Sequence, residues 1–185
     1  SDNGTVPFST DLNSPFGTAW DTKTFQDGRH TLRAKAYDVA GNSAISTEIA
    51  VTIDNVFPIV NLSAPQDNST ASGSIVISVS ASDNIGIGKI NFYRDDNILL
   101  GTDTSAPFSI NWDTIKTTNG RHTIFARAID KADNASSSPA RVVNIDNGSP
   151  DIAPPAVSIT SPLSGAAVAG YVMIEALATD DKKIS

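Results

Sequence analysis

The residues with the clearest chemical potential are aspartates and asparagines that follow runs of apolar residues. Six of them form the candidate set: Asp54, Asn55, Asp83, Asn84, Asp130 and Asn134. Carboxylate and amide oxygens are hard ligands of the kind that surrounds Ca²⁺ in proteins. The same side chains favour turns, because they accept hydrogen bonds from their own backbone. The sequence favours the turn interpretation and leaves calcium as the alternative.

These residues belong to a unit that the chain contains more than once. Trp20-Asp21-Thr22 recurs as Trp112-Asp113-Thr114, a spacing of 92 residues (112 − 20). Further pairs share this spacing: Gly28-Arg29-His30-Thr31 with Gly120-Arg121-His122-Thr123, Asp38 with Asp130, Asn42 with Asn134, and Ile53-Asp54-Asn55 with Ile145-Asp146-Asn147. A second spacing, of 97 residues, relates Pro58, Pro65, Gly73 and Asp83 to Pro155, Pro162, Gly170 and Asp180. Constant spacings indicate tandem copies of one folding unit.

The spacings divide the chain into one complete and two partial copies. We expect residues 1–55 to hold the last strands of one repeat, 56–147 a complete repeat, and 155–185 the first two strands of another. Residues 148–154 form the second linker, whose composition predicts a looser joint than the short apolar Val56-Phe57. A segment of a longer array explains the partial copies, and pairing of the two ends between chains is the alternative.

Period-two alternation predicts strands in the complete copy, and helical periodicity is absent. The expected strands are 58–64, 74–82, 89–94, 98–100, 107–112, 123–129 and 140–145. The side chains expected to face inward are Ile75, Ile77, Val79, Ala81, Ile90, Phe92, Ile124, Ala126, Ala128, Val143 and Ile145. Seven short strands separated by turns predict an all-β sandwich.

Catalysis finds little support. The chain has no cysteine, which excludes thiol catalysis, disulfides and cysteine-ligated zinc. His30 and His122 stand at equivalent places after a turn glycine, and no serine lies in a recognisable nucleophile setting. We interpret both histidines as structural and expect a protein that is not an enzyme.

The aromatic residues raise the question of glycan binding. Trp20 and Trp112 could stack on sugars, but their fixed context between Pro-Phe and Asp-Thr favours a plug at the edge of the core. Tyr37 and Phe125 differ between copies and are predicted to face outward. They are therefore the better candidates for surface contacts.

Five segments carry a resemblance to a known family: 81–83, 92–103, 107–114, 119–134 and 155–162. As a set they closely resemble the bacterial Ig-like repeats of secreted and cell-surface proteins. Asp133 and Asp27 depart from the pattern, which usually has Gly and Asn there. The resemblance implies tandem immunoglobulin-like β-sandwich repeats and a spacer, stalk, adhesive or accessory role.

The implied fold also places the acidic loops. In an Ig-like sandwich, the loops after the second and sixth strands lie at the end where the preceding repeat arrives. We therefore expect Asp83, Asp130 and Asp54 to converge at the first junction. Asp146, Asn147, Asp180 and Asp181 give the second junction a comparable group, although its longer linker makes a shared site there less favourable.

The composition of the chain limits the classes of partner that it can bind. The net charge of −7 argues against binding to nucleic acid, whose phosphates need a basic surface. No apolar run approaches the roughly 20 residues that span a bilayer. We expect an extracellular or cell-surface segment that contacts neighbouring Ig-like repeats and a surface glycan or protein. The alternative is an accessory module of a secreted polysaccharide-degrading enzyme.

Overall fold

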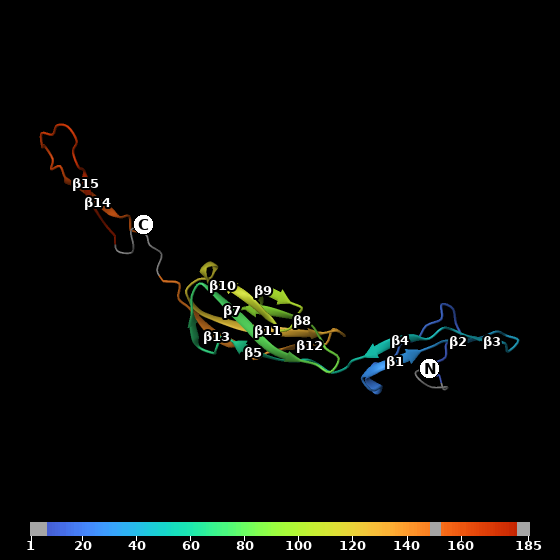
Figure 1. The fold of residues 1–185 in the computed structure, drawn as a ribbon. Helices are drawn as coiled ribbons and strands as arrows, with labels where there is room; N and C mark the ends of the chain where they lie inside the picture. Colours follow the sequence, from blue (N-terminus) through green and yellow to red (C-terminus); the bar gives the residue numbers. More distant parts are fainter. Residues whose placement is uncertain (1–6, 149–152, 181–185) are drawn as a thin grey trace. The chain divides into compact units, whose positions relative to one another are not determined.

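The computed structural model describes residues 7–148 and 153–180 and divides the chain into two compact units, Ser1–Asn147 and Gly148–Ser185. Most of the predicted linker 148–154 and Asp181 lie outside the described residues. The described helices are two single turns of 3₁₀ helix, η1 (Thr22–Thr24) and η2 (Thr114–Lys116). Strands form the rest of the regular structure, as Figure 1 shows.

The complete repeat is a sandwich of two sheets. Its strands are β5 (Ile59–Ala64), β6 (Ser69–Ala71), β7 (Ser74–Ser82), β8 (Ile87–Arg94), β9 (Ile98–Asp103), β10 (Ser109–Asp113), β11 (Gly120–Asp130), β12 (Ala135–Ser137) and β13 (Arg141–Ile145). One sheet has the order β10-β7-β5, and the other has the order β6-β13-β11-β8-β9 with β12 paired to β11. The all-β immunoglobulin-like sandwich is therefore confirmed.

Apolar side chains from both sheets meet in one core. Ile90, Phe92, Ile124, Ala126, Ala128 and Val143 are fully buried, and Ile77 and Ile145 are 1% exposed. Ile75, Val79 and Ala81 are partly buried and pack against them. These are the side chains that period-two alternation places on the inner face of a half-buried strand. The predicted core is thus confirmed.

Residues 7–55 reproduce the last strands of the complete repeat. The strands β1 (Gly28–Leu32), β2 (Lys35–Tyr37), β3 (Ser43–Ile45) and β4 (Ile49–Ile53) pair as β1-β4 and β2-β3. Gly28 lies opposite Ile53 just as Gly120 lies opposite Ile145. The repeat in the sequence is therefore a repeat of strand register as well.

The described residues of the second unit contain a single antiparallel pair, β14 (Ala156–Ser161) and β15 (Glu175–Thr179). Residue Ile159 in β14 and its equivalent Leu62 in β5 both precede a register shift in the ladder. Apolar side chains of this pair, such as Val157 and Leu177, are exposed. These two strands correspond to the first two predicted for a partial copy.

Two short strands of the complete repeat were missed by the sequence pattern. β6 and β12 have three residues each, which is too short for alternation to be recognised. β6 pairs in parallel with β13, and β12 pairs with β11 after the Asp130 loop. Both strands depend on a neighbouring ladder more than on their own composition.

Gly88 lets β8 approach β11 where the ladder is irregular. A Cβ atom at this position would lie 2.7 Å from the Asp130 carbonyl oxygen, closer than non-bonded atoms approach. The β8-β11 register shifts between Ile129 and Asp130. The glycine therefore helps to set the position of Asp130 at the end of β11.

We predict that Gly88→Ala destabilises the complete repeat by about 1–3 kcal/mol, because the methyl group forces two paired strands apart. Thermal or urea unfolding measures the change. Gly17→Ala is the matched control, since nothing lies within 4 Å of the added Cβ there. Equal stability of the two variants would contradict this account of Gly88.

Candidate functional site

Three of the predicted ligands come together at the junction of the first two repeats. Asp54 follows β4, Asp83 follows β7, and Asp130 ends β11. One carboxylate oxygen from each lies within 4.8 Å of the other two. Asp54 is 9% exposed and Asp130 is 3% exposed, while Asp83 is half-buried. Residues that are far apart in the sequence thus form one acidic cluster, here called the junction cluster.

Local hydrogen bonds hold two members of the junction cluster in place. Asp83 Oδ2 accepts from the backbone N–H groups of Ile85 and Gly86, both at 2.9 Å. Asp130 Oδ1 accepts from the N–H groups of Ala132 at 2.8 Å and Asn134 at 2.9 Å. These are the Asx turns expected at strand ends.

The Asp130 loop has a counterpart that lies outside any such cluster. Asp38 Oδ1 accepts from the N–H groups of Ala40 at 3.0 Å and Asn42 at 2.7 Å. The Asn42 side chain donates to Asp38 Oδ2, as Asn134 does to Asp130. Asp38 is exposed, and no metal-ligand cluster among the described residues includes it. The loop therefore forms without the other carboxylates.

Oxygen atoms in the junction cluster are not all used by these turns. Asp54 Oδ1 accepts from the Val56 N–H at 3.2 Å, whereas Asp54 Oδ2 is buried without a hydrogen-bond partner. Asp83 Oδ1 is likewise buried and unpartnered. Burial raises the pKa of Asp54, and the negative charges of Asp83, Asp130 and Asp27 raise it further. The cluster concentrates negative charge in a place of poor solvation.

The three predicted asparagines act differently from one another. The Asn134 side chain donates to Asp130 Oδ2 and to the Asp54 backbone carbonyl, at 2.9 and 3.0 Å. Asn84 is exposed and donates to Asp27 Oδ2 at 3.1 Å. Asn55 faces the first repeat, where it bonds with Thr22 and Asp27. Asn134 and Asn84 therefore tie the two repeats together.

The Asn55 contacts recur at Asn147. Thr114 Oγ1 donates to Asn147 Oδ1 at 3.1 Å, as Thr22 does to Asn55. The Asn147 N–H donates to Asn119 Oδ1, whereas Asn55 uses Asp27, the equivalent of Asn119. These contacts close each repeat at its last strand.

The linker itself contributes little burial. Val56 is 47% exposed and Phe57 is 62% exposed. The hydrogen bonds from Asn134 and Asn84 are polar contacts between the repeats, and the stiffness of this joint stays a prediction. Within the second unit Asp180 is described, and Asp181 lies outside the described residues.

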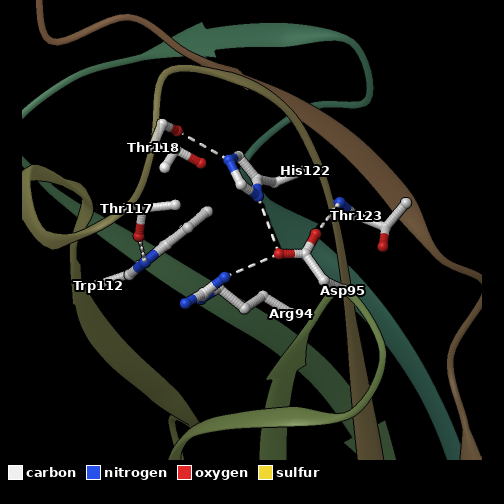
Figure 2. Close-up of polar contacts among 7 residues, drawn as sticks. All are labelled: Arg94, Asp95, Trp112, Thr117, Thr118, His122 and Thr123. Atoms are coloured by element: carbon white, nitrogen blue, oxygen red, sulfur yellow. Dashed lines mark hydrogen bonds and ion pairs between the residues drawn. The ribbon is translucent and has the colours of Figure 1, made fainter.

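His122 has a structural environment, which Figure 2 shows. Its Nδ1 lies 2.9 Å from Asp95 Oδ2, and its Nε2 donates to the Thr118 carbonyl at 2.8 Å. Arg94 donates to the same Asp95 oxygen at 2.8 Å. Asp95 lies between β8 and β9, and nothing in the sequence marked it as the partner of His122. His30 contacts the Gln26 carbonyl in the same way, at 2.7 Å.

The aromatic candidates are mostly covered. Trp112 is 3% exposed and its Nε1 donates to Thr117, so it has no free face for a sugar. Trp20 is half-buried and stacks on Phe8, with ring centroids 5.6 Å apart. Phe125 stacks on Tyr93 at 5.1 Å. Tyr37 remains 68% exposed.

This sandwich matches a family model. Residues 58–126 match the model described as bacterial Ig domain. Over these residues the central repeat is similar to bacterial Ig domains. The comparison with curated proteins gave no match. Among the described residues, no helix is both long and apolar enough to cross a membrane.

Solved structures with similarity to this chain include one shorter chain and two larger proteins. Fibronectin(III)-like modules of Clostridium thermocellum CbhA are 24% identical with a TM-score of 0.43, covering 47% of this chain and 94% of that one. An endo-β-1,4-mannanase from Thermotoga petrophila is 12% identical with a TM-score of 0.41, covering 51% and 21%. Dimeric latent PorU from Porphyromonas gingivalis is 13% identical with a TM-score of 0.39, covering 67% and 13%. The chain thus spans small parts of the last two.

The Asp95 network predicts a pH dependence of stability. Burial raises the pKa of Asp95, but hydrogen bonds from His122, Arg94 and Thr123 outweigh it and leave this pKa below its ordinary value of 3.8. The ionised form therefore stabilises the folded state above pH 3.8, and this contribution is lost as the pH falls through the lowered pKa.

We predict that Asp95→Asn lowers the free energy of unfolding near pH 6 by about 1–3 kcal/mol and that this loss becomes smaller as the pH falls below 3.8. Asparagine suits the variant because Asp95 has a φ of +46°, which asparagine tolerates. Urea unfolding across this pH range measures the difference. Asp96→Asn, at an exposed neighbour, controls for loss of charge. A pH-independent loss in Asp95→Asn would contradict the assignment.

Proposed function

We propose that the chain is a non-catalytic spacer segment of a secreted or surface-anchored bacterial protein, in which Ig domains are joined in series. One observation carries the proposal: the short Val56-Phe57 segment joins the two copies, and side chains of the second copy bond to the first. A bacterial Ig domain at residues 58–126 agrees with this use.

The complete repeat also has a bond pattern suited to tension. A pull along the chain enters at β5 and leaves at β13, which lie in different sheets. Arg141, the first residue of β13, donates to the carbonyl groups of Leu62 at 2.6 Å and Pro65 at 2.7 Å. The Val142 N–H donates to Asp67 Oδ1 at 2.7 Å. The first and last strands are therefore linked across the sandwich.

We expect Arg141→Gln to lower the force at which the complete repeat unfolds in single-molecule pulling, because it breaks this link. The equilibrium loss is about 1–3 kcal/mol, as for hydrogen bonds to a charged group. Arg127→Gln is the matched control, since Arg127 is exposed on β11. Unchanged unfolding force in Arg141→Gln would contradict the mechanical role of the link.

The location of the parent protein tests the spacer proposal directly. We expect antibodies against this segment to label intact cells or the culture medium, and external protease to remove the cell-bound signal. A cytoplasmic marker protein, protected in the same cells, is the control. A segment that remains protected with that marker would overturn the proposal.

A further inference from the structure

The junction cluster contains more oxygen than its turns require. The Asx turns at Asp83 and Asp130 use Asp83 Oδ2 and both oxygens of Asp130. Asp54 Oδ2 and Asp83 Oδ1 are buried and have no hydrogen-bond partner. A buried polar atom without a partner is costly in a folded protein, so each one calls for a ligand. The turn interpretation accounts for the Asp130 loop but leaves these two atoms unexplained.

Among the residues that the structure describes, no lysine, arginine or histidine forms an ion pair with the junction cluster. The ion pairs among the described residues involve other carboxylates, such as Asp95 with Arg94 and Asp113 with Lys116. Lys131 follows Asp130 directly but is exposed, and its amine lies near Gly86. The negative charges around Asp54, which together with burial raise its pKa, therefore stay uncompensated by the described protein groups.

The donor atoms of the junction cluster indicate which kind of ion it would bind. Its members are carboxylates, which are hard donors, and no histidine or cysteine is among them. Oxygens bound to one Ca²⁺ at about 2.3–2.6 Å can lie up to roughly 5 Å apart, whereas the shorter Mg²⁺ bonds hold ligands closer. The three oxygens lie within 4.8 Å of one another, a spacing that the ligands of one Ca²⁺ can have. Calcium also tolerates irregular coordination better than magnesium does.

We propose that Asp54, Asp83 and Asp130 bind one Ca²⁺ ion, which fixes the end of the first repeat against the central Ig domain. Asp54 leaves β4 of the first repeat, and the other two ligands belong to the complete repeat. The ion bridges them and removes the charge repulsion that otherwise weakens this joint. The inference deepens the spacer function, on which it rests for its role in the cell.

Titration calorimetry of the chelator-treated chain with CaCl₂ at pH 7 tests the binding. We expect one site with a dissociation constant on the order of 10⁻⁴ M, the range of extracellular calcium modules, and much weaker binding of MgCl₂. The melting temperature should rise by several degrees with millimolar CaCl₂, because the ion binds the folded state. No heat of binding and no change in melting temperature would overturn the proposal.

The variant Asp54→Asn tests whether Asp54 binds calcium or has a purely structural role. The variant keeps an oxygen for the Val56 N–H but removes one charge, so we expect at least tenfold weaker calcium binding. Its melting temperature without calcium should equal or exceed that of the wild type, because repulsion in the cluster falls. A purely structural Asp54 would instead give a lower melting temperature and an unchanged calcium response.

Asp38→Asn is the matched control, since it makes the same change in the equivalent of the Asp130 loop, away from the cluster. We expect it to retain the wild-type calcium affinity. Loss of affinity in this variant as well would point to a general effect of charge and contradict the assigned site. These measurements use purified protein, so their outcome is independent of where the parent protein is located.

Discussion

Backbone N–H groups at the ends of strands need acceptors, and in this chain aspartate and asparagine side chains supply them. Asp103 accepts from Ser105 and Ser109, as Asp11 does from Asn13 and Gly17 one repeat earlier. A sandwich without disulfides or long helices depends on such contacts to define its turns. The acidic composition is thus a consequence of how the strands are connected, before any ligand is considered.

The same requirement creates the junction cluster. In the complete repeat, Asp83 follows β7 and Asp130 ends β11, each forming a local turn, and the preceding repeat contributes Asp54 after β4. When the repeats follow one another after two linker residues, three carboxylates that each suit their own segment meet in one buried place. Turn formation explains why aspartates occupy these positions. It does not explain the buried oxygens of Asp54 and Asp83 that have no hydrogen-bond partner.

The sandwich could be predicted because the chain contains two copies of the repeat that can be compared with each other. Two copies reveal which positions keep their character, and Ile124, Ala126 and Ala128 are fully buried as that comparison implied. Strands β6 and β12 could not be predicted, because they are defined by pairing with longer neighbours. The meeting of Asp54, Asp83 and Asp130 was expected from the Ig-like topology that the family resemblance implied. The unpartnered oxygens did not, since they depend on side-chain rotamers that no spacing encodes.

Differences between the copies carry information that their similarities cannot. Asp27 stands where the complete repeat has Asn119, and both accept from the backbone N–H of the closing asparagine. An asparagine would be sufficient for that bond. Asp27 uses its second oxygen to accept from Asn84 of the next repeat, and its charge adds to the field at Asp54. The substitution therefore makes sense as a property of the junction, because the second oxygen and the charge of Asp27 act on groups at the joint.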